Sequence, residues 1–505
     1  MSWREGIAEL RAETLSKLPE LTRSGGLPPL DRFAGASLRL GGAVALWAAL
    51  ESRREQPKSR AALSRRLRRA FERLGPAYIK LGQIVSAGRG LFPDEVVEEF
   101  ATLRDRVPPE PFAAVREVVE ADLGRKLEDV FARFDEASLA AASIAQVHAA
   151  RLHSGEEVVV KVQRPQVARL VRSDLRAMAW IAPFLVGRIS VAALANPPAL
   201  VELFAETISE ELDFRLEAEN MLDVARLLQD AGQTKLVVPR PHPELVTRRV
   251  LVMERLDGYT IAQADEMRAA GIDTEAVLRA LLISFLEGAM IYGVFHGDLH
   301  AGNLFVLPDG RVALLDFGMT GRMNPKERQA FMRLMVTGLT NDMPNHLAAF
   351  RDLGALPEGA DLDALARALK LDRPPVDPTQ LTGEELVAEI QDVLKQLLAH
   401  GARLPKHLML YVKNLMFIDG AIGALAPDVD LFAEVGRIFA YFSTTHGERI
   451  AREVGGDVQL TELDLTGFKA SLGLRNDVET LTHRQLMQRR EIVRKRLEDA
   501  GGPRL

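Results

Sequence analysis

The side chains best suited to chemistry lie in two short segments that are close in sequence. Asp298 and Asn303 stand five positions apart in residues 295–303, which read FHGDLHAGN, and Asp316 opens an Asp-Phe-Gly triplet. Phosphoryl transfer from Mg·ATP requires a carboxylate near the attacking group, and Mg²⁺ prefers oxygen ligands such as those of aspartate and asparagine. Gly318 permits a sharp change of chain direction that would expose the Asp316 carboxylate. Aspartate and asparagine also cap ordinary turns, but the joint pattern favours a magnesium and phosphate site.

Lys161 is a second candidate for phosphate chemistry. It stands in the run VVVKV at residues 158–162, where an unpaired charge among valines would be unfavourable. A strand lysine of this kind contacts the ATP phosphates in kinases and pairs with a helix glutamate. The alternative is a surface lysine on an exposed strand. The segment that follows offers five glutamate partners: Glu206, Glu210, Glu211, Glu217 and Glu219.

The turn that should cover the phosphates is rich in alanine instead of glycine. A protein kinase carries a Gly-x-Gly-x-x-Gly turn between its first two strands, whereas residues 139–145 here read LAAASIA. Alanine is less favourable than glycine at positive φ, and its methyl group keeps a phosphate further from the backbone. The residues concerned are Ala140, Ala141, Ala142 and Ser143, of which the serine can still offer its hydroxyl. No Ala-Pro-Glu follows Asp316, so a typical peptide-docking segment is not expected.

The elements that must position these residues form an α+β pattern. Residues 1–125 have the apolar spacing of helices, and the remainder from about residue 324 is also predicted to be helical. Between them we expect a hairpin at 145–153 and 157–163, a glutamate-rich helix at 198–230, strands at 236–238 and 249–254, a helix at 274–292, and a hairpin at 304–307 and 311–315. Strands and helices in this order predict an α+β fold.

Composition narrows the function classes. The 505 residues are 47% hydrophobic and 27% charged, as in ordinary globular proteins, and the net charge is −6. That charge argues against nucleic acid as a partner. The absence of cysteine excludes disulfides, thiolate metal sites and cysteine nucleophiles.

Membrane spans are not expected from the sequence. Residues 38–50 fall short of the roughly 20 apolar residues that a spanning helix needs, and the longer run at 180–200 is interrupted by Arg188 and closed by Pro197 and Pro198. No signal peptide is evident, so we predict a cytoplasmic protein. The basic stretch at 53–73 fits peripheral contact with anionic lipid at the inner face of a membrane, and a solvated helix face is the equal alternative. A second basic stretch covers 484–496.

Three further motifs make the sequence resemble the UbiB-type (aarF-domain) atypical kinases, a family of the protein-kinase-like superfamily, from about residue 70 to about residue 430. Residues 80–83 read KLGQ and resemble the family's Lys-x-Gly-Gln signature. Residues 140–148 resemble its alanine-rich loop, and residues 211–213, which read ELD, resemble its Glu-x-Asp motif. The family is linked to ubiquinone and other isoprenoid-lipid metabolism, and its members are ATPases or presumed small-molecule kinases.

The resemblance implies a two-lobed protein-kinase-like fold with a helical N-terminal extension and a helical C-terminal region. The expected parts are residues 1–125, the helical extension with the Lys-x-Gly-Gln motif; 126–258, an N-lobe with inserted helices; 259–450, a helical C-lobe; and 451–505, a polar helical tail.

The resemblance also implies roles for individual residues. Lys161 would contact the α and β phosphates of ATP and pair with Glu217, Asp298 would be the catalytic base, and Asn303 and Asp316 would ligate Mg²⁺. Residues of the hinge that contacts adenine would be Met253, Glu254 and Leu256. Lys80 and Gln83 would lie on a lid that engages Glu211 and Asp213 and occupies the space where a protein kinase receives its peptide.

Some features qualify these implications. Ala301 stands where many members have proline, and the chain ends in a charged helix where many bacterial members have membrane helices, which weakens the link to lipid. His296 and His300 flank Asp298, and we expect them to hold the loop because no third ligand at a suitable spacing makes a metal site.

The resulting prediction is an enzyme that binds Mg·ATP and either hydrolyses it or phosphorylates a small, lipid-like molecule. A nucleotide-responsive scaffold with little turnover is the alternative from another class. A conventional protein kinase is disfavoured by the alanine-rich turn and the lid motif. The sequence leaves the acceptor, the pathway and the oligomeric state open.

Overall fold

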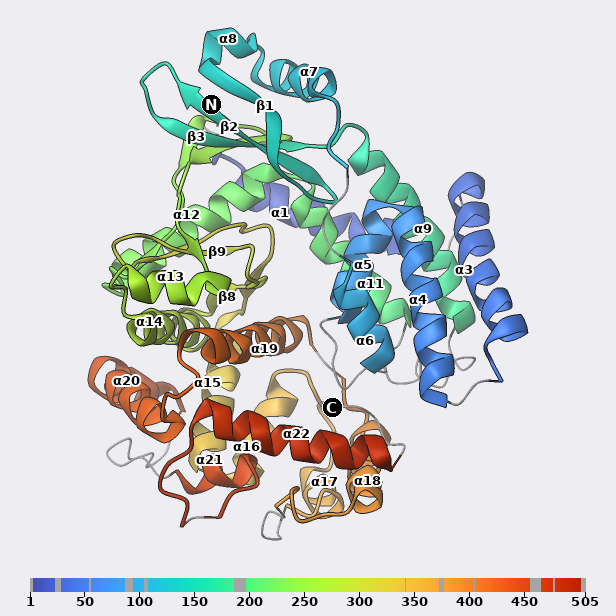
Figure 1. Cartoon of the computed structure of the whole chain (residues 1–505), viewed down its shortest axis with the longest axis vertical. Coiled ribbons are helices and arrows are strands. Elements are labelled where there is room, and N and C mark those ends of the chain that lie inside the picture. Colours follow the sequence, from blue (N-terminus) through green and yellow to red (C-terminus); the bar gives the residue numbers. More distant parts are fainter. Residues whose placement is uncertain are drawn as a thin grey trace. The chain divides into compact units, whose positions relative to one another are not determined.

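The computed structural model describes residues 3–22, 29–53, 56–86, 94–103, 108–185, 197–340, 342–371, 377–403, 405–454, 465–475 and 477–500. The chain divides into two units (Figure 1). Unit 1 contains residues Met1–Asp223, Pro239–Leu256 and Asp316–Met319, and unit 2 contains Val224–Val238, Asp257–Leu315 and Thr320–Leu505. The Asp-Phe-Gly triplet therefore belongs to unit 1, whereas the Asp298 loop belongs to unit 2.

Unit 1 contains an antiparallel sheet in the order β1-β2-β3-β6-β5. The strands are β1 (Phe131–Ala141), β2 (Ala145–Leu152), β3 (Glu157–Gln163), β5 (Pro241–Val246) and β6 (Val250–Glu254). The hairpin predicted at 145–163 is confirmed as β2 and β3. Alternation along β3 buries Val158, Val160 and Val162 against α7 (Phe112–Leu123), which lies over the sheet together with α8 (Leu127–Val130) (Figure 1). Lys161 consequently points to the other face of the sheet.

The rest of unit 1 is helical. Its helices are α1 (Ile7–Ser16), α2 (Leu18–Thr22), α3 (Leu30–Leu50), α4 (Gln56–Leu74), α5 (Pro76–Ser86), α6 (Asp94–Ala101), α9 (Val167–Leu185), α11 (Pro197–Glu211) and the first part of α12 (Phe214–Asp230). The single helix expected at 198–230 is thus two helices. The side chain of Asp213 accepts a hydrogen bond from the backbone N–H of Arg215 at 3.2 Å, so that it caps the start of α12 and interrupts the run.

Unit 2 carries two small sheets. The first has the order β4-β10-β9-β7, and the second pairs β8 with β11. These strands are β4 (Leu236–Val237), β7 (Tyr259–Thr260), β8 (Val294–His296), β9 (Leu304–Val306), β10 (Val312–Leu314) and β11 (Thr320–Arg322). The second predicted hairpin is confirmed as β9 and β10. Strands β7, β8 and β11 were not expected, because segments of two or three residues carry no readable alternation.

Helices make up the remainder of unit 2. They are α13 (Ala264–Ala269), α14 (Thr274–Glu287), α15 (Pro325–Thr340), α16 (Met343–Asp352), α17 (Leu362–Ala368), α18 (Gly383–Ala399), α19 (Lys406–Leu425), α20 (Leu431–Val454), α21 (Thr466–Ser471) and α22 (His483–Asp499), with a 3₁₀ turn η1 (Ile261–Gln263). The helix predicted at 274–292 ends in a π-helical turn, η2 (Gly288–Tyr292), where a Cβ on Gly288 would lie 2.6 Å from the carbonyl oxygen of Val294. The α+β class predicted from the sequence is confirmed.

Two described helices are long and apolar enough to cross a membrane, which corrects the expectation of no such segment. Helix α3 extends the apolar run at 38–50 back to Leu30 and has 21 residues, and α19 has 20 residues; both reach a hydropathy of 1.4. The sequence pattern missed the full length of α3 because Asp31, Arg32 and Arg39 interrupt its first half. The two differ in burial, with 44% of the apolar window of α19 buried but 11% of that of α3. Most of the run at 180–200 lies outside the described residues.

Candidate nucleotide and metal site

Lys161 lies at the centre of a buried ion-pair network in unit 1. Its Nζ contacts both carboxylate oxygens of Glu217 on α12, at 2.7 and 2.9 Å, and Oδ1 of Asp316 at 3.3 Å. The side chains of Lys161 and Glu217 are only 13% and 3% exposed. Burial alone would lower the pKa of Lys161, but the charges of Asp316 and Glu217 outweigh it and raise the pKa above its ordinary value. Lys161 is therefore a fixed cation, available to phosphate oxygens.

The backbone around Asp316 presents its carboxylate. Asp316 has φ of 56°, a left-handed conformation that aspartate tolerates better than most residues. Its Oδ1 accepts a hydrogen bond from the N–H of Gly318 at 3.1 Å, while the Phe317 side chain is fully buried and its carbonyl accepts from Nδ2 of Asn220 at 2.9 Å. The Asp316 side chain remains 45% exposed. The buried phenylalanine thus holds the segment, and the acid stays accessible.

The Lys-x-Gly-Gln motif lies close to this network through Lys80. Lys80 Nζ lies 3.0 Å from Oε1 of Glu211, and a Cβ on Gly318 would lie 3.4 Å from Cγ of Glu211. The Lys80–Glu211 pair is therefore adjacent to the Asp-Phe-Gly segment. Gly82 of the motif is needed for close packing, because a Cβ there would lie 2.3 Å from the side chain of Leu103.

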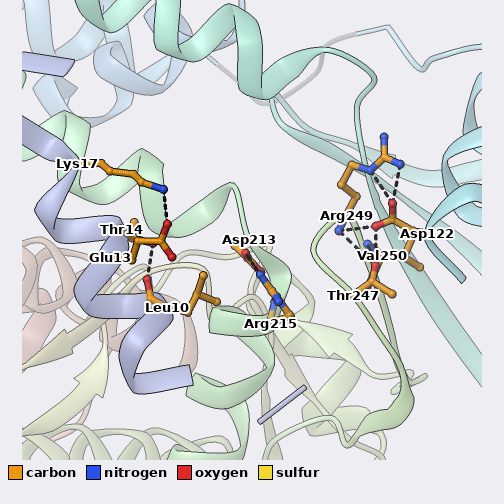
Figure 2. Close-up of polar contacts among 10 residues, drawn as sticks. All are labelled: Leu10, Glu13, Thr14, Lys17, Asp122, Asp213, Arg215, Thr247, Arg249 and Val250. Carbon is orange, nitrogen blue, oxygen red and sulfur yellow. Dashed lines mark hydrogen bonds and ion pairs between the residues drawn. The ribbon is translucent and has the colours of Figure 1, made fainter. Parts of the chain in front are cut away.

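Gln83 and Asp213, which the resemblance also assigns to the lid, make contacts close to their own elements. The amide of Gln83 donates to the carbonyl of Leu103 at 3.3 Å. Asp213 forms a two-point pair with the guanidinium of Arg215, at 2.7 and 2.9 Å (Figure 2). Gln83 thus ties down the end of α6, and Asp213 organises the start of α12.

In unit 2, the Asp298 loop is held by helix α19. Lys413 Nζ forms an ion pair with Oδ1 of Asp298. The next residue, Asn414, donates to the carbonyl of His296, and its Oδ1 accepts from the N–H of Leu299 at 2.9 Å. Sequence reasoning missed Lys413 and Asn414, because they lie more than 100 residues after the loop. The one available signal was a polar pair in the middle of an otherwise apolar helix.

Hydrogen bonds of Asn303, His296 and His300 also hold the Asp298 loop. Asn303 Nδ2 donates to the carbonyl of Asp298 at 3.1 Å, which leaves the amide oxygen for a cation. The N–H of Leu315, the residue before Asp316, donates to the carbonyl of Asn303 at 2.8 Å. Nδ1 of His296 accepts from the N–H of Asp298 at 3.1 Å, so its Nε2 donates to the carbonyl of Leu315 at 3.0 Å. His300 Nδ1 accepts from Gly302 at 3.0 Å. Both histidines have the loop-holding contacts that were predicted.

The alanine-rich segment is half strand and half turn. Ala140 and Ala141 are the last residues of β1, and Ala142 and Ser143 form the turn into β2. The N–H of Ala142 donates to the carbonyl of Ala145 at 2.8 Å. The carbonyl of Ala142 accepts a hydrogen bond from Nε of Arg164 at 2.8 Å. Arg164 directly follows β3, so this contact holds the turn against the end of that strand.

The predicted hinge residues follow one another at the end of β6. Met253 is buried and pairs with Val159 of β3, and the N–H of Glu254 donates to the carbonyl of Arg240 at 2.9 Å. Leu256 is the last residue of its segment in unit 1, and the chain enters unit 2 at Asp257. These residues therefore lie at the connection between the units.

Within the described residues, no group of three or more histidine, aspartate or glutamate side chains is arranged to hold a metal ion. The oxygen donors of Asp316 and Asn303 nevertheless suit Mg²⁺, which is commonly bound by one or two protein groups together with substrate phosphates and water.

Comparison with known proteins identifies the family. Residues 102–349 match the ABC1 atypical kinase-like domain. An uncharacterised protein of Mycobacterium tuberculosis is 36% identical over 406 residues, covering 78% of this chain and 80% of the relative. An uncharacterised chloroplastic aarF domain-containing protein kinase of Arabidopsis thaliana is 33% identical, with 75% of each chain covered. A probable protein kinase UbiB of Pseudomonas aeruginosa is 33% identical, covering 78% of this chain and 74% of the relative.

These matches confirm the resemblance drawn from the sequence motifs and the kinase-like fold that it implied. The alanine-rich turn and the buried Lys161–Glu217 pair fall within the region that matches the family model, and the Lys-x-Gly-Gln helix precedes it. The chain belongs to the ABC1, or UbiB and aarF-domain, family of atypical kinases.

Proposed function

We propose that this protein binds Mg·ATP and transfers its γ-phosphoryl group to a small acceptor or to water. The observation that carries the proposal is the network of Lys161, Glu217 and Asp316. A buried lysine oriented by a glutamate and lying beside an accessible aspartate matches the arrangement that holds ATP phosphates and a metal ion in kinases. In this proposal, adenine is contacted by the hinge residues Met253, Glu254 and Leu256. The ATP phosphates are covered by the turn at 140–143.

Asn303 and Asp316 are the proposed Mg²⁺ ligands. When bound, the ion neutralises charge on the β and γ phosphates. The protein's own contribution is to present two preformed oxygen donors: the Gly318 N–H holds the Asp316 carboxylate, and the Asp298 carbonyl holds the Asn303 amide.

Asp298 is the proposed catalytic base. In the transfer step, the acceptor oxygen forms a bond to the γ-phosphorus, the bond to the β-phosphate oxygen breaks, ADP leaves, and Asp298 takes the acceptor's proton. Lys413 holds the Asp298 carboxylate in a single position, which makes Lys413 a positioning residue for this step.

Replacing Lys413 by methionine is expected to reduce kcat for ADP formation by about 10²-fold with little change in KM for ATP. The physical reason is that the methionine keeps the packing of α19 but leaves Asp298 without its anchor. Lys413→Arg should restore part of the rate, because it retains the cation. Lys395→Met, at an exposed lysine of α18, is the matched control. A KM effect of the same size as the kcat effect would contradict a positioning role.

A small, lipid-like acceptor such as an isoprenoid phenol is the proposed substrate class, in support of ubiquinone or related lipid metabolism. The proposal rests on relatives that carry the UbiB name. ADP release should be measured with and without an isoprenoid phenol. A protein that binds Mg·ATP tightly but shows no stimulated turnover would instead favour the nucleotide-responsive scaffold.

We also propose that α3 and α4 make peripheral contact with anionic lipid, as fits a protein at the cytoplasmic face of a membrane. Helix α3 leaves Leu38 and Leu46 78% and 51% exposed. On α4, Arg66 and Arg68 are paired with Glu51 and Glu99, whereas Arg69 and Arg73 are exposed without side-chain partners among the described residues. The two helices pack on each other, and Trp47 Nε1 donates to the Ser59 carbonyl at 3.0 Å. An apolar surface beside a basic one is typical of lipid contact.

The double variant Arg69→Glu/Arg73→Glu is expected to weaken sedimentation with phosphatidylglycerol vesicles by at least about 10-fold, because each basic residue near an anionic surface contributes about 1 kcal/mol. Leu38→Glu should weaken it as well. Ile492→Glu, at an exposed apolar residue of the basic helix α22, is the control. Equal loss in all three variants would contradict an α3 and α4 contact.

A further inference from the structure

Unit 1 contains a polar cavity that none of the proposed nucleotide-binding residues lines. It has a volume of about 780 Å³ and lies at the N-terminal turns of α9, beside the end of β3 and the turn that precedes β6. Its lining residues with polar or charged side chains are Asp122, Gln163, Arg164, Gln166, Arg169, Arg172, Ser173, Arg176, Arg248 and Arg249. Six of these are arginines and one is an acid, so the cavity is strongly basic although the whole chain has a net charge of −6.

Four of the charged lining residues have side-chain contacts, including Arg169, which donates to Oε1 of Gln166 at 2.7 Å. Asp122 accepts from Arg249 Nε at 2.7 Å and from Thr247 Oγ1 at 2.8 Å, so its negative charge is already compensated (Figure 2). Arg164 donates to the Ala142 carbonyl and to Glu110, at 2.8 and 2.9 Å. These contacts hold the walls of the cavity and leave its remaining cations uncompensated.

Arg172, Arg176 and Arg248 are exposed, and none of the three forms a side-chain hydrogen bond or ion pair within the described part of the chain. Arg172 and Arg176 are four positions apart on α9 and share one helix face. The opposite face of α9 carries Asp174, which is buried and paired with Arg32 at 2.6 Å. Like charges at this spacing repel one another, and a bound anion would relieve the repulsion.

Gln163 adds a neutral donor to the same cavity. Its side chain is 2% exposed, and its Nε2 has no hydrogen-bond partner among the residues that the structure describes. A buried donor without an acceptor costs about 1–3 kcal/mol, and a ligand that supplied an acceptor oxygen would remove this cost. The first turn of α9, at Val167 and Ala168, also lines the cavity, and the N-terminus of a helix favours an anion.

We propose that this cavity binds a phosphate group, with the guanidinium groups of Arg172, Arg176 and Arg248 and the amide of Gln163 as donors. Arginine forks match phosphate oxygens in pairs, and a phosphate offers enough acceptor oxygens for several donors at once. The volume of about 780 Å³ leaves room for a molecule larger than a lone phosphate. That molecule is either a soluble phosphorylated compound or a lipid with a phosphate headgroup.

The test is calorimetric titration of the full-length protein with inorganic pyrophosphate in EDTA, which removes the divalent cation that the nucleotide site requires. The wild type should bind with a saturable signal, and Arg172→Gln/Arg248→Gln should weaken binding at least 10-fold. Arg125→Gln, at an exposed arginine of unit 1 outside the cavity, should bind as the wild type does. No saturable binding by the wild type, or an unchanged Kd in the double variant, would overturn the proposal.

Gln163→Leu supplies a second, independent readout. It removes the unpartnered donor while keeping a similar shape, so the melting temperature without ligand should stay the same or rise, whereas pyrophosphate binding should weaken several-fold. Lower stability with unchanged affinity would assign Gln163 to the structure alone and overturn its part in the site.

Vesicles distinguish the two sources of phosphate. If the ligand is a lipid, phosphatidic acid vesicles should displace pyrophosphate from the wild type and phosphatidylcholine vesicles should not. If it is soluble, neither vesicle should compete. Both results support the phosphate site. Competition that is as strong in Arg172→Gln/Arg248→Gln as in the wild type would contradict it, because the vesicles would then act elsewhere on the protein.

Discussion

Asp316→Asn is expected to abolish the stabilisation of this protein by Mg·ATP while leaving the unliganded fold intact. Asparagine keeps the oxygen that accepts from the Gly318 N–H and tolerates the left-handed backbone at φ of 56°, so the local structure should persist. Only the charge is lost. At a ligand concentration 100 times Kd, the wild type should gain about 2.7 kcal/mol of stability, and the variant should gain almost none. The measurement is a thermal shift series in ATP with and without Mg²⁺.

Asp309→Asn is a matched control for this experiment. Asp309 also accepts a hydrogen bond from a backbone N–H two residues later, that of Arg311 at 3.0 Å, and it is exposed in the turn between β9 and β10. Its replacement removes the same charge from the same kind of local contact. Mg·ATP should stabilise Asp309→Asn as it does the wild type. Full stabilisation of Asp316→Asn would rule out Asp316 as a metal ligand.

The second large effect, on both stability and turnover, is expected when the buried Lys161–Glu217 ion pair is broken. Lys161→Met leaves Glu217, whose side chain is 3% exposed, without its cation. Removing one partner of a buried ion pair destabilises a protein by about 3–5 kcal/mol, so chemical denaturation should show a loss of this size. ATP turnover should fall to background, because no other described lysine contacts Asp316 and Glu217 together.

The double variant Lys161→Met/Glu217→Gln separates stability from function. Glutamine removes the unpaired buried charge, so the double variant should recover most of the stability lost in Lys161→Met. Turnover should stay at background, because the phosphate-binding cation is still missing. Recovery of both stability and turnover would show that Lys161 serves the fold alone.

Much of the site could be predicted from sequence because its motifs are local. Asp298 and Asn303 share one loop, and the short hairpin of β9 and β10 returns the chain so that the N–H of Leu315 donates to the carbonyl of Asn303. Lys161 was predictable because a charge among valines on a central strand needs a partner, and Glu217 is that partner in the structure. The β2–β3 hairpin followed from alternation and from the Ser154 and Gly155 turn.

Contacts between distant segments were beyond such reasoning. The resemblance implied that the lid engages Asp213. In the structure, Asp213 forms an ion pair with Arg215, two residues later, at the start of α12. The amide of Gln83 donates to the backbone carbonyl of Leu103. The position of a backbone carbonyl cannot be predicted from the pattern of side chains. Spacing within a motif shows that its residues share a face, but it does not show which neighbour will satisfy each of them.

The sequence by itself predicted a magnesium and phosphate centre of Asp298, Asn303 and Asp316, and it determined that a lysine stands among valines and that an alanine-rich segment replaces the glycine-rich one. The tertiary structure alone decided that Lys413 anchors Asp298, and that Arg172, Arg176 and Arg248 line one cavity with the unpartnered Gln163. The physical reason is the separation in sequence between the residues that interact. Helix and strand periodicity act over a few residues, whereas charges brought together by packing come from segments that are separated by tens of residues or more.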